Sequence, residues 1–219
     1  MRVLAILPVY NEEKTIYGVL KTLTSSQLLD RIVVIDKSTD NSLEKIKRFE
    51  HIELIHDHPD DRGKGQAVRI ATENIEEDIV FLCDADLVGF RKEHIEKILN
   101  PLLNGEADMC VGLRDRFGPI GRFLARYTPL IGGERAIYTK HFKKIREIDL
   151  IDDYGLEIVM NEYCKRRGLK IKKINLRGYD QVFKYHKWKH IPFRTWFQKW
   201  KSGPPTLFIT WLKVKRTYF

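Results

Sequence analysis

Short apolar runs alternate with segments of helical periodicity along the first part of the chain. Runs rich in β-branched residues are typical of buried strands, and apolar residues spaced three or four apart are typical of amphipathic helices. The predicted strands are Val3–Leu7, Arg31–Asp36, Ile52–Ile55, Asp78–Cys83 and Ala107–Gly112. The predicted helices are Lys14–Leu23, with Asn11 as a candidate N-cap, a helix that carries Leu43, Ile46 and Phe49, then Gln66–Ile75 and Glu93–Leu103. This alternation predicts an α/β fold with a doubly wound, mostly parallel sheet.

The pattern loosens after residue 113, where residues 118–133 suit a long functional loop. Leu156–Arg167 then reads as a helix and Leu169–Ile174 as a strand with one wet face. The chain enters a strand at once, so no signal peptide is expected, and no apolar run approaches the ~20 residues that span a bilayer. Three cysteines without metal-ligand spacing indicate a reducing compartment. A cytoplasmic protein is therefore expected.

Charge divides the chain into two parts. Nine of its 39 basic residues, and none of its 30 acidic residues, lie in residues 181–219, so residues 1–180 are formally neutral. All four tryptophans also lie in that tail, at Trp188, Trp196, Trp200 and Trp211. We therefore expect a domain over residues 1–180 and a basic, aromatic, helical appendage over residues 181–219.

The composition of the tail has three interpretations. Basic residues interleaved with tryptophan are typical of a segment that lies on a membrane surface, here the cytoplasmic face. The same interleaving serves nucleic acid in other proteins, but nucleic acid is not the expected partner here. The third interpretation is that the aromatic side chains pack onto the domain while the lysines stay solvated.

Asp84-Ala85-Asp86 follows directly after the predicted strand Asp78–Cys83. In an open α/β sheet the ligand crevice lies at the carboxyl ends of the strands, so the two carboxylates are expected at a binding edge. Carboxylates one residue apart can reach one hard divalent cation, Mg²⁺ or Mn²⁺, which in turn binds a diphosphate. A solvated acidic loop is the alternative that the tripeptide alone leaves open.

Four motifs stand in order along the chain: Pro8–Glu13, Ile35–Asp40, Arg62–Gly65 and Asp84–Asp86. Their order and spacing resemble those of family-two glycosyltransferases, in the branch of dolichyl-phosphate mannose synthases and glucosyl-phosphoglycerate synthases. The likeness covers residues 1–180. It implies a GT-A type fold, a GDP-sugar or UDP-sugar donor, and a divalent metal, Mg²⁺ or Mn²⁺.

The resemblance also implies a donor site. Backbone groups after Pro8 can line a base pocket, Glu12 can accept from a ribose hydroxyl, and Asp36 can accept from a base imino N–H. Lys64, between two glycines, can place a cation near the base or the diphosphate. The expected donor set is Pro8, Val9, Tyr10, Glu12, Asp36, Lys64, Asp84, Arg114 and Tyr154. The alternatives are a helix-dipole role for Glu12, a loop cap for Asp36 and a solvated side chain for Lys64.

The implied metal ligands are Asp84, Asp86 and His186. The dolichyl-phosphate branch usually has Gln two residues after the second Asp, but Val88 stands there, so this segment is closer to the phosphoglycerate branch. In that branch a downstream His completes the metal site, and His186 is the nearest candidate. Neutral imidazole suits Mn²⁺ better than Mg²⁺. The alternative is that His186 is one of several basic residues of the tail.

Two further segments resemble the acceptor side of the family. Gly132–Ala136 is similar to the acceptor loop, where Glu134 would orient an acceptor or sugar hydroxyl, and Arg135 would otherwise pair with a carboxylate. Asp152–Glu157 is similar to a second signature at the start of a helix. Inverting transfer needs a carboxylate base on an acceptor hydroxyl, whereas the low pKa of an acceptor phosphate makes a strong base unnecessary. The implied catalytic set is Asp84, Asp86, Glu134 and Glu157.

Arg114 follows a predicted strand and can neutralise a diphosphate or an acceptor phosphate, although an ordinary ion pair with Asp115 is the alternative. The expected activity is hexosyl transfer to a phosphate-bearing acceptor, either a polyprenyl (dolichyl) phosphate at a membrane or a soluble molecule such as phosphoglycerate. A rival from another class is a non-catalytic membrane-surface or nucleic-acid binding protein on a transferase-like fold. Lys37 and Val88, which depart from the family pattern, favour that rival, and the retained carboxylates oppose it.

Overall fold

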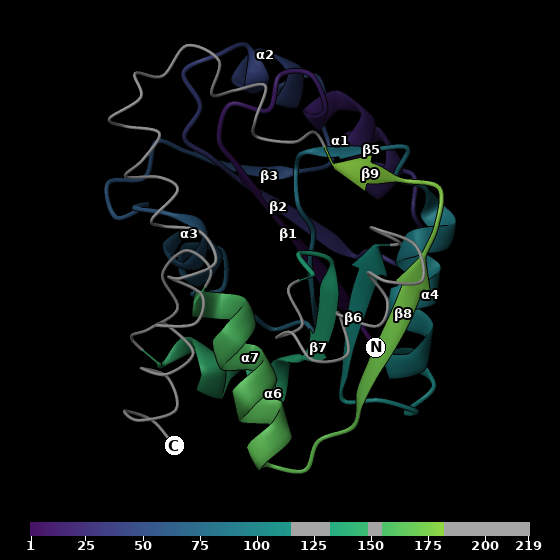
Figure 1. Ribbon diagram of the computed structural model, residues 1–219. Helices are drawn as coiled ribbons and strands as arrows, with labels where there is room; N and C mark the ends of the chain where they lie inside the picture. Colours follow the sequence, from purple (N-terminus) through teal and green to yellow (C-terminus); the bar gives the residue numbers. More distant parts are fainter. Residues whose placement is uncertain (115–131, 149–154, 182–219) are drawn as a thin grey trace, which may run out of the picture.

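The structure is a computed structural model, and it describes residues 1–114, 132–148 and 155–181. Over these residues a seven-stranded sheet has the order β3-β2-β1-β4-β7-β6-β8 (Figure 1). The strands are β1 (Val3–Val9), β2 (Arg31–Asp36), β3 (Glu53–His56), β4 (Ile79–Leu82), β6 (Met109–Arg114), β7 (Arg135–Tyr138) and β8 (Ile171–Leu176). The helices are α1 (Ile16–Thr24), α2 (Ser42–Ile46), α3 (Lys64–Ala71), α4 (Lys92–Leu103), α6 (Thr139–Arg146) and α7 (Gly155–Arg166).

Strand direction divides the sheet. β1 pairs in parallel with β2 and β4, and β2 pairs in parallel with β3, so these four strands end at one edge. β7 runs antiparallel to both β4 and β6, whereas β6 and β8 are parallel. The predicted α/β fold with a mostly parallel sheet is confirmed, and the reversed strand β7 was not foreseen. The predicted helical appendage lies outside the described residues.

Helices cover both faces of the sheet, and β1 shows how the sequence produces this. Successive side chains of a strand point to opposite faces. Val3, Ala5 and Leu7 join one buried cluster, which α1 and α4 complete. Leu4 and Ile6 join a second cluster, which α3, α6 and α7 complete. A strand that is buried on both faces has to be continuously apolar. The sequence of β1 is therefore a continuous apolar run and not an alternation of apolar and polar residues.

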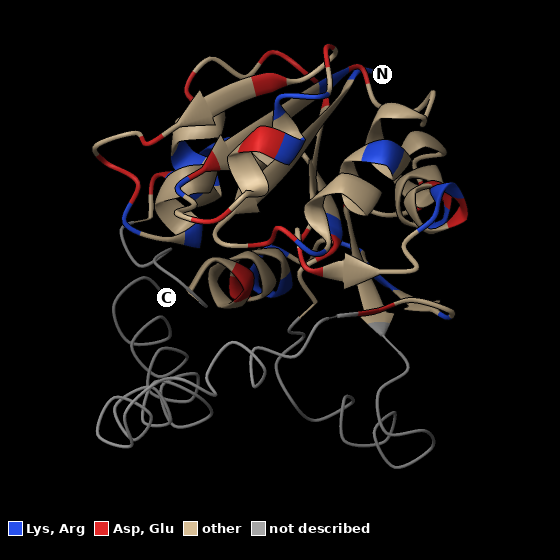
Figure 2. Cartoon of the chain, turned by 90° about the horizontal axis from the view of Figure 1, so that it is seen from above, with Lys and Arg blue, Asp and Glu red and all other residues tan. Residues whose placement is uncertain are grey.

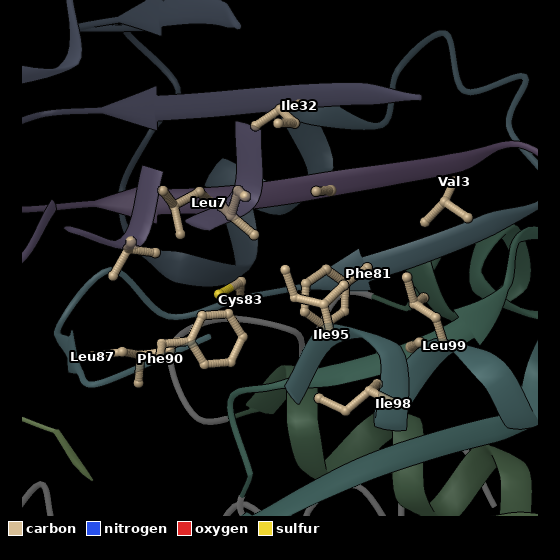
Figure 3. Packing of buried hydrophobic residues seen from close by; sticks show 14 of the residues in the cluster. Val3, Leu7, Ile32, Phe81, Cys83, Leu87, Phe90, Ile95, Ile98 and Leu99 are labelled. Atoms are coloured by element: carbon tan, nitrogen blue, oxygen red, sulfur yellow. The ribbon is translucent and has the colours of Figure 1, made fainter. Parts of the chain in front are cut away.

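The first cluster packs strand residues directly against α4. Figure 3 shows Phe81 of β4 beside Ile95 and Leu99 of α4, with Val3 farther along β1. Each of these side chains is at least 99% buried. Full burial of such a side chain contributes about 1.5–3 kcal/mol, so this interface fixes the position of the strand that leads to Asp84.

A second, two-stranded sheet lies beside the main one. β5 (Leu87–Val88) pairs antiparallel with β9 (Asp180–Gln181). The pairing places the chain directly after Asp86 next to the end of the described residues. Among the described helices, none is long and apolar enough to cross a membrane.

Two local predictions at the end of β1 were wrong. The strand predicted to end at Leu7 continues through Pro8 to Val9, which lies opposite Asp36 in the register. Asn11 does not cap α1. It adopts a left-handed conformation at φ 55°, and its side-chain oxygen accepts from the backbone N–H of Thr39 at 2.8 Å. Asn can adopt this conformation at low cost, and here it joins the loop after β1 to the loop after β2.

Candidate active site

Charged side chains gather where the parallel strands end, and two of them, Asp84 and Asp86, follow β4. Cys83, Ala85 and Leu87 all belong to the buried cluster under α1 and α4. Asp84 and Asp86, which follow the end of β4, do not belong to that cluster. Asp86 is buried, and the Asp84 side chain is 18% exposed. The segment after β4 therefore places two carboxylates at the predicted binding edge.

Lys64 joins Asp84 to Glu157. Its Nζ lies 2.8 Å from Asp84 Oδ1 and 2.7 Å from Glu157 Oε1, so α3, the end of β4 and α7 meet at one ammonium group. Burial by itself lowers the pKa of Lys64, but the two carboxylates outweigh it and hold this pKa well above its ordinary value. The solvated alternative for Lys64 is wrong. A predicted donor residue and two predicted catalytic residues are thus in direct contact.

Gly133 lies against the same Asp84 carboxylate. A Cβ atom at residue 133 would be 1.8 Å from Asp84 Oδ2, and one at residue 132 would be 2.3 Å from the Gly112 carbonyl oxygen. Any larger residue would therefore push the chain off Asp84 or off β6. The two glycines thus let the backbone approach Asp84 and the neighbouring strand β6 closely.

Glu134 is fully buried, and its carboxylate is held by Tyr179, which lies 45 residues later in the sequence. The Tyr179 hydroxyl donates to Glu134 Oε2 at 2.9 Å. The tyrosine ring packs edge-on against Phe90 and near His94, which accounts for its fixed position. Tyr179 precedes β9 directly, so the small sheet orients a predicted catalytic carboxylate. Sequence reasoning missed Tyr179.

Arg135 is the buried group that ties the acceptor-side segments together. Its Nε and Nη2 donate to the Gly132 carbonyl oxygen at 2.9 and 2.7 Å, and Nη1 donates to the Glu157 carbonyl oxygen at 3.3 Å. Burial lowers the pKa of this guanidinium. In addition to any contact with a carboxylate, the Arg135 guanidinium therefore donates hydrogen bonds to main-chain carbonyl oxygens. These bonds fix the turn at Gly132 relative to the first turn of α7.

The loops after β1 and β2 form the other half of the site. The Asn11 backbone N–H donates to Ser38 Oγ at 2.9 Å, and the Glu12 backbone N–H donates to Ser42 Oγ at 2.8 Å. Tyr10 directly follows β1 and precedes Asn11 in the sequence, and it is 64% exposed. A large aromatic side chain exposed beside a binding edge suits a stacking partner such as a nucleobase.

Asp36 ends β2 and is completely buried. Ser38 Oγ donates to its Oδ1 at 2.5 Å, and His56 Nδ1 lies 2.9 Å from its Oδ2. Lys37, which departs from the family pattern, turns to the other side, and its Nζ donates to the Asp61 carbonyl oxygen at 2.6 Å. The expectation that Asp36 binds a base stays a prediction, and its present partners belong to its own chain.

Some predicted residues are placed only in part. Tyr154 and His186 lie outside the described residues, and Arg114 is the last residue of β6. No group of three His, Cys, Asp or Glu side chains close enough to hold a metal ion occurs within the described ranges.

In the view of Figure 2, basic and acidic segments are interspersed over the described elements, in keeping with their equal numbers in residues 1–180.

Comparison with known families decides the classification. The model of the family described as "Glycosyl transferase family 2" matches residues 4–174. The chain belongs to glycosyl transferase family 2. The match extends from β1 into β8, and it includes Lys64, Asp84 and Glu157.

Two individual relatives share about a third or less of their residues with this chain over the matched parts. The low-salt glycan biosynthesis hexosyltransferase Agl6 of Haloferax volcanii is 33% identical over 113 residues, which are 50% of this chain and only 26% of that protein. The uncharacterized protein MJ0544 of Methanocaldococcus jannaschii is 29% identical over 175 residues, 74% of this chain and 73% of that protein. The chain thus spans about a quarter of the first relative and most of the second.

Solved structures share the fold. Glucosyl-3-phosphoglycerate synthase from Mycobacterium tuberculosis, in complex with Mn²⁺, UDP-glucose and phosphoglyceric acid, superposes with a TM-score of 0.75 at 22% identity. The superposition covers 97% of this chain and 79% of that protein. The GT-A type fold implied by the sequence motifs is therefore confirmed.

Proposed function

We propose that this chain is a metal-dependent hexosyltransferase that moves a sugar from a nucleotide-diphosphate sugar to a phosphate-bearing acceptor. The observation that carries this proposal is the cluster of Asp84, Lys64 and Glu157 at the carboxyl edge of a family-2 sheet, with Asp86 beside it. Carboxylates and a cation held in fixed positions at this edge suit the binding of a charged donor.

The residues at this edge fit a hard divalent cation. Two carboxylates follow β4 one residue apart, and Mg²⁺ is commonly bound by one or two carboxylates together with substrate phosphates and water. A site of this kind does not require three protein ligands among the described residues. Asp84 and Asp86 would hold the ion, with His186 as the proposed third ligand. The bound ion would neutralise the charge that develops on the leaving diphosphate.

The residues of the chain itself would position the two substrates. The nucleotide would lie over Pro8–Glu12 and Asp36, with Lys64 and Arg114 near the diphosphate. Glu134 and Glu157 would orient hydroxyls of the sugar or acceptor near Tyr154. Support for this arrangement comes from the fixed carboxylate of Glu134 under Tyr179 and from the contact of Glu157 with Lys64.

Two kinds of acceptor carry the phosphate in this proposal. The basic, tryptophan-rich residues 181–219 favour a polyprenyl phosphate at a membrane surface. A soluble acceptor is the second candidate, because structures with this fold include the mycobacterial synthase with phosphoglyceric acid and with glycerol 3-phosphate. In both cases the nucleophile is a phosphate or a hydroxyl beside one, which suits a cationic group such as Arg114.

A panel of nucleotide sugars tests the activity. We expect Mn²⁺-dependent release of nucleoside diphosphate from a UDP-sugar or GDP-sugar, accelerated by either a polyprenyl phosphate in detergent or 3-phosphoglycerate. The acceptor that accelerates release identifies the acceptor class. Turnover of no nucleotide sugar with any acceptor, by a chain that is folded by circular dichroism, would refute the proposed transferase.

The membrane prediction concerns residues 181–219. We expect the full chain to co-sediment with anionic vesicles at low salt and to be released at high salt, because each Lys or Arg near the surface contributes about 1 kcal/mol. Replacing both Lys199 and Lys201 by Gln should weaken this binding, and vesicles of phosphatidylcholine alone are the control. Equal partitioning onto both kinds of vesicle would remove the electrostatic part, and no partitioning would favour the soluble acceptor.

A further inference from the structure

Glu134 carries a carboxylate that the structure encloses completely. The residue has no exposed surface, and its backbone carbonyl oxygen accepts from the Gly112 N–H of β6 at 2.8 Å. The preceding residue, Gly133, lies against the carboxylate of Asp84, a proposed metal ligand. Burial of a carboxylate is costly unless hydrogen-bond donors compensate it. The groups that hold Glu134 therefore decide how it can act.

Tyr179 supplies one such donor. Its hydroxyl donates to Glu134 Oε2 at 2.9 Å. Because a donor prefers to lie near the plane of the oxygen that accepts from it, this bond sets the orientation of the carboxylate and not only its stability. The match to the family model ends at residue 174, so it does not include Tyr179. The contact is therefore a feature of this chain that the family match leaves unassigned.

The tyrosine is held by the part of the chain that follows Asp86. β9 begins directly after Tyr179 and pairs with β5, which begins directly after Asp86. The Tyr179 ring packs against Phe90 and His94, with ring centroids 5.5 and 4.8 Å apart. His94 Nε2 also lies 2.9 Å from the Arg177 carbonyl oxygen, just before the tyrosine. The segment from β5 to the start of α4 therefore fixes both the backbone and the ring of Tyr179.

We propose that Tyr179 is a positioning residue of the transferase, whose hydroxyl holds the Glu134 carboxylate in the orientation that sugar transfer requires. This inference rests on the proposed function, in which Glu134 orients a hydroxyl of the sugar or the acceptor. The tyrosine acts through Glu134. Because its support comes from the residues after Asp86, the small sheet sets the Glu134 carboxylate and that proposed metal ligand relative to each other. A purely structural tyrosine would stabilise the fold without setting the rate of transfer.

Steady-state kinetics of Tyr179→Phe test the inference, because this substitution keeps the ring and removes only the hydroxyl. The assay measures release of nucleoside diphosphate, at saturating Mn²⁺, from the UDP-sugar or GDP-sugar that the native chain uses. We expect kcat to fall by about tenfold to a hundredfold, the size of one hydrogen bond to a charged group. The KM for the nucleotide sugar, and the calorimetric Kd for UDP or GDP with Mn²⁺, should change by less than about twofold.

Glu134→Gln separates a positioning role from a structural one. If the hydroxyl acts through the carboxylate, Tyr179→Phe should have little further effect on kcat once residue 134 is Gln, because residues that act as a unit are not additive. Tyr138→Phe is the matched control. Tyr138 is at the other end of β7, and its hydroxyl donates to the Leu102 carbonyl oxygen. This variant also loses a hydrogen bond, but away from the site, and should retain the native kcat.

Three results would overturn the inference while leaving the transferase in place. The first is an unchanged kcat in Tyr179→Phe. The second is the same fold-loss from Tyr179→Phe in the native and the Glu134→Gln backgrounds. The third is a loss that appears in the Kd for UDP or GDP and not in kcat. Turnover of no nucleotide sugar by the native chain would overturn the proposed function and this inference with it.

Discussion

Asp86→Ala is expected to lower metal-dependent sugar transfer by about a thousandfold while the fold survives. Such a loss corresponds to about 4 kcal/mol of transition-state stabilisation, a contribution within the range for a metal that neutralises a leaving diphosphate. Asp86 follows β4 at the binding edge and is not part of the apolar cluster that holds Cys83 and Ala85. Its loss therefore removes a proposed ligand without removing an apolar side chain from that cluster. Initial rates at saturating Mn²⁺ and, separately, Mg²⁺ are the measurement.

The control for this variant comes from the same strand. Asp78 precedes β4 at its other end, is exposed, and accepts a hydrogen bond from the Arg2 backbone N–H. Asp78→Ala should retain transfer, because it lies at the opposite edge of the sheet. Full activity of the Asp86 variant at saturating metal would exclude Asp86 as a required metal ligand.

Lys64→Met should destabilise the fold as well as impair the donor site. The substitution leaves Asp84 and Glu157, whose side chains are 18% and 5% exposed, without the cation that lies between them. Removal of one partner from a buried ion pair costs about 3–5 kcal/mol, and the partial exposure of Asp84 places the expected loss near about 3 kcal/mol. Urea denaturation at neutral pH measures this loss of unfolding free energy. Lys47→Met, which breaks an exposed pair with Glu44, is the control and should cost less than about 0.5 kcal/mol.

The pH dependence of the Lys64 variant has a defined sign. Without the ammonium group, two largely buried carboxylates of like charge face each other in the folded state, and both burial and like charge disfavour the ionised forms. Such groups bind more protons when folded, so the stability of the variant rises as the pH falls toward their unfolded value of about 4. The difference from the native chain should therefore be smaller at about pH 5 than at about pH 7. An equal difference at both pH values would show that the two carboxylates do not depend on Lys64.

Apolar runs were enough to predict most of the sheet. β1, β2 and β4 are buried on both faces and therefore read as continuous runs, and each ends within a few residues of a predicted functional group. β7 escaped prediction because it is short and begins with Arg135, a charged residue that is completely buried. Its guanidinium donates hydrogen bonds to the carbonyl oxygens of Gly132 and Glu157, and no pattern in the local sequence predicts partners of that kind.

The sequence placed the acidic residues of the site better than it placed their partners. Asp84 was expected from its position after a strand, but its contact with Lys64 depends on how α3 packs on the sheet. Tyr179 lies 45 residues from Glu134 along the chain, and His56 lies 20 residues from Asp36. The second contact follows from the register of β2 and β3, so it can be predicted only when the pairing of those strands is known.

Calorimetric titration of the native chain with UDP and GDP, first with Mn²⁺ and then with EDTA, tests the central claim most directly. A diphosphate held through a cation on Asp84 and Asp86 should bind with a Kd at least about tenfold lower when Mn²⁺ is present, for one of the two nucleotides. The accompanying stabilisation of the fold should reach about 2.7 kcal/mol at a hundredfold excess over Kd. Equal affinity with and without the metal, or no binding of either nucleotide, would contradict a metal-dependent nucleotide-sugar transferase.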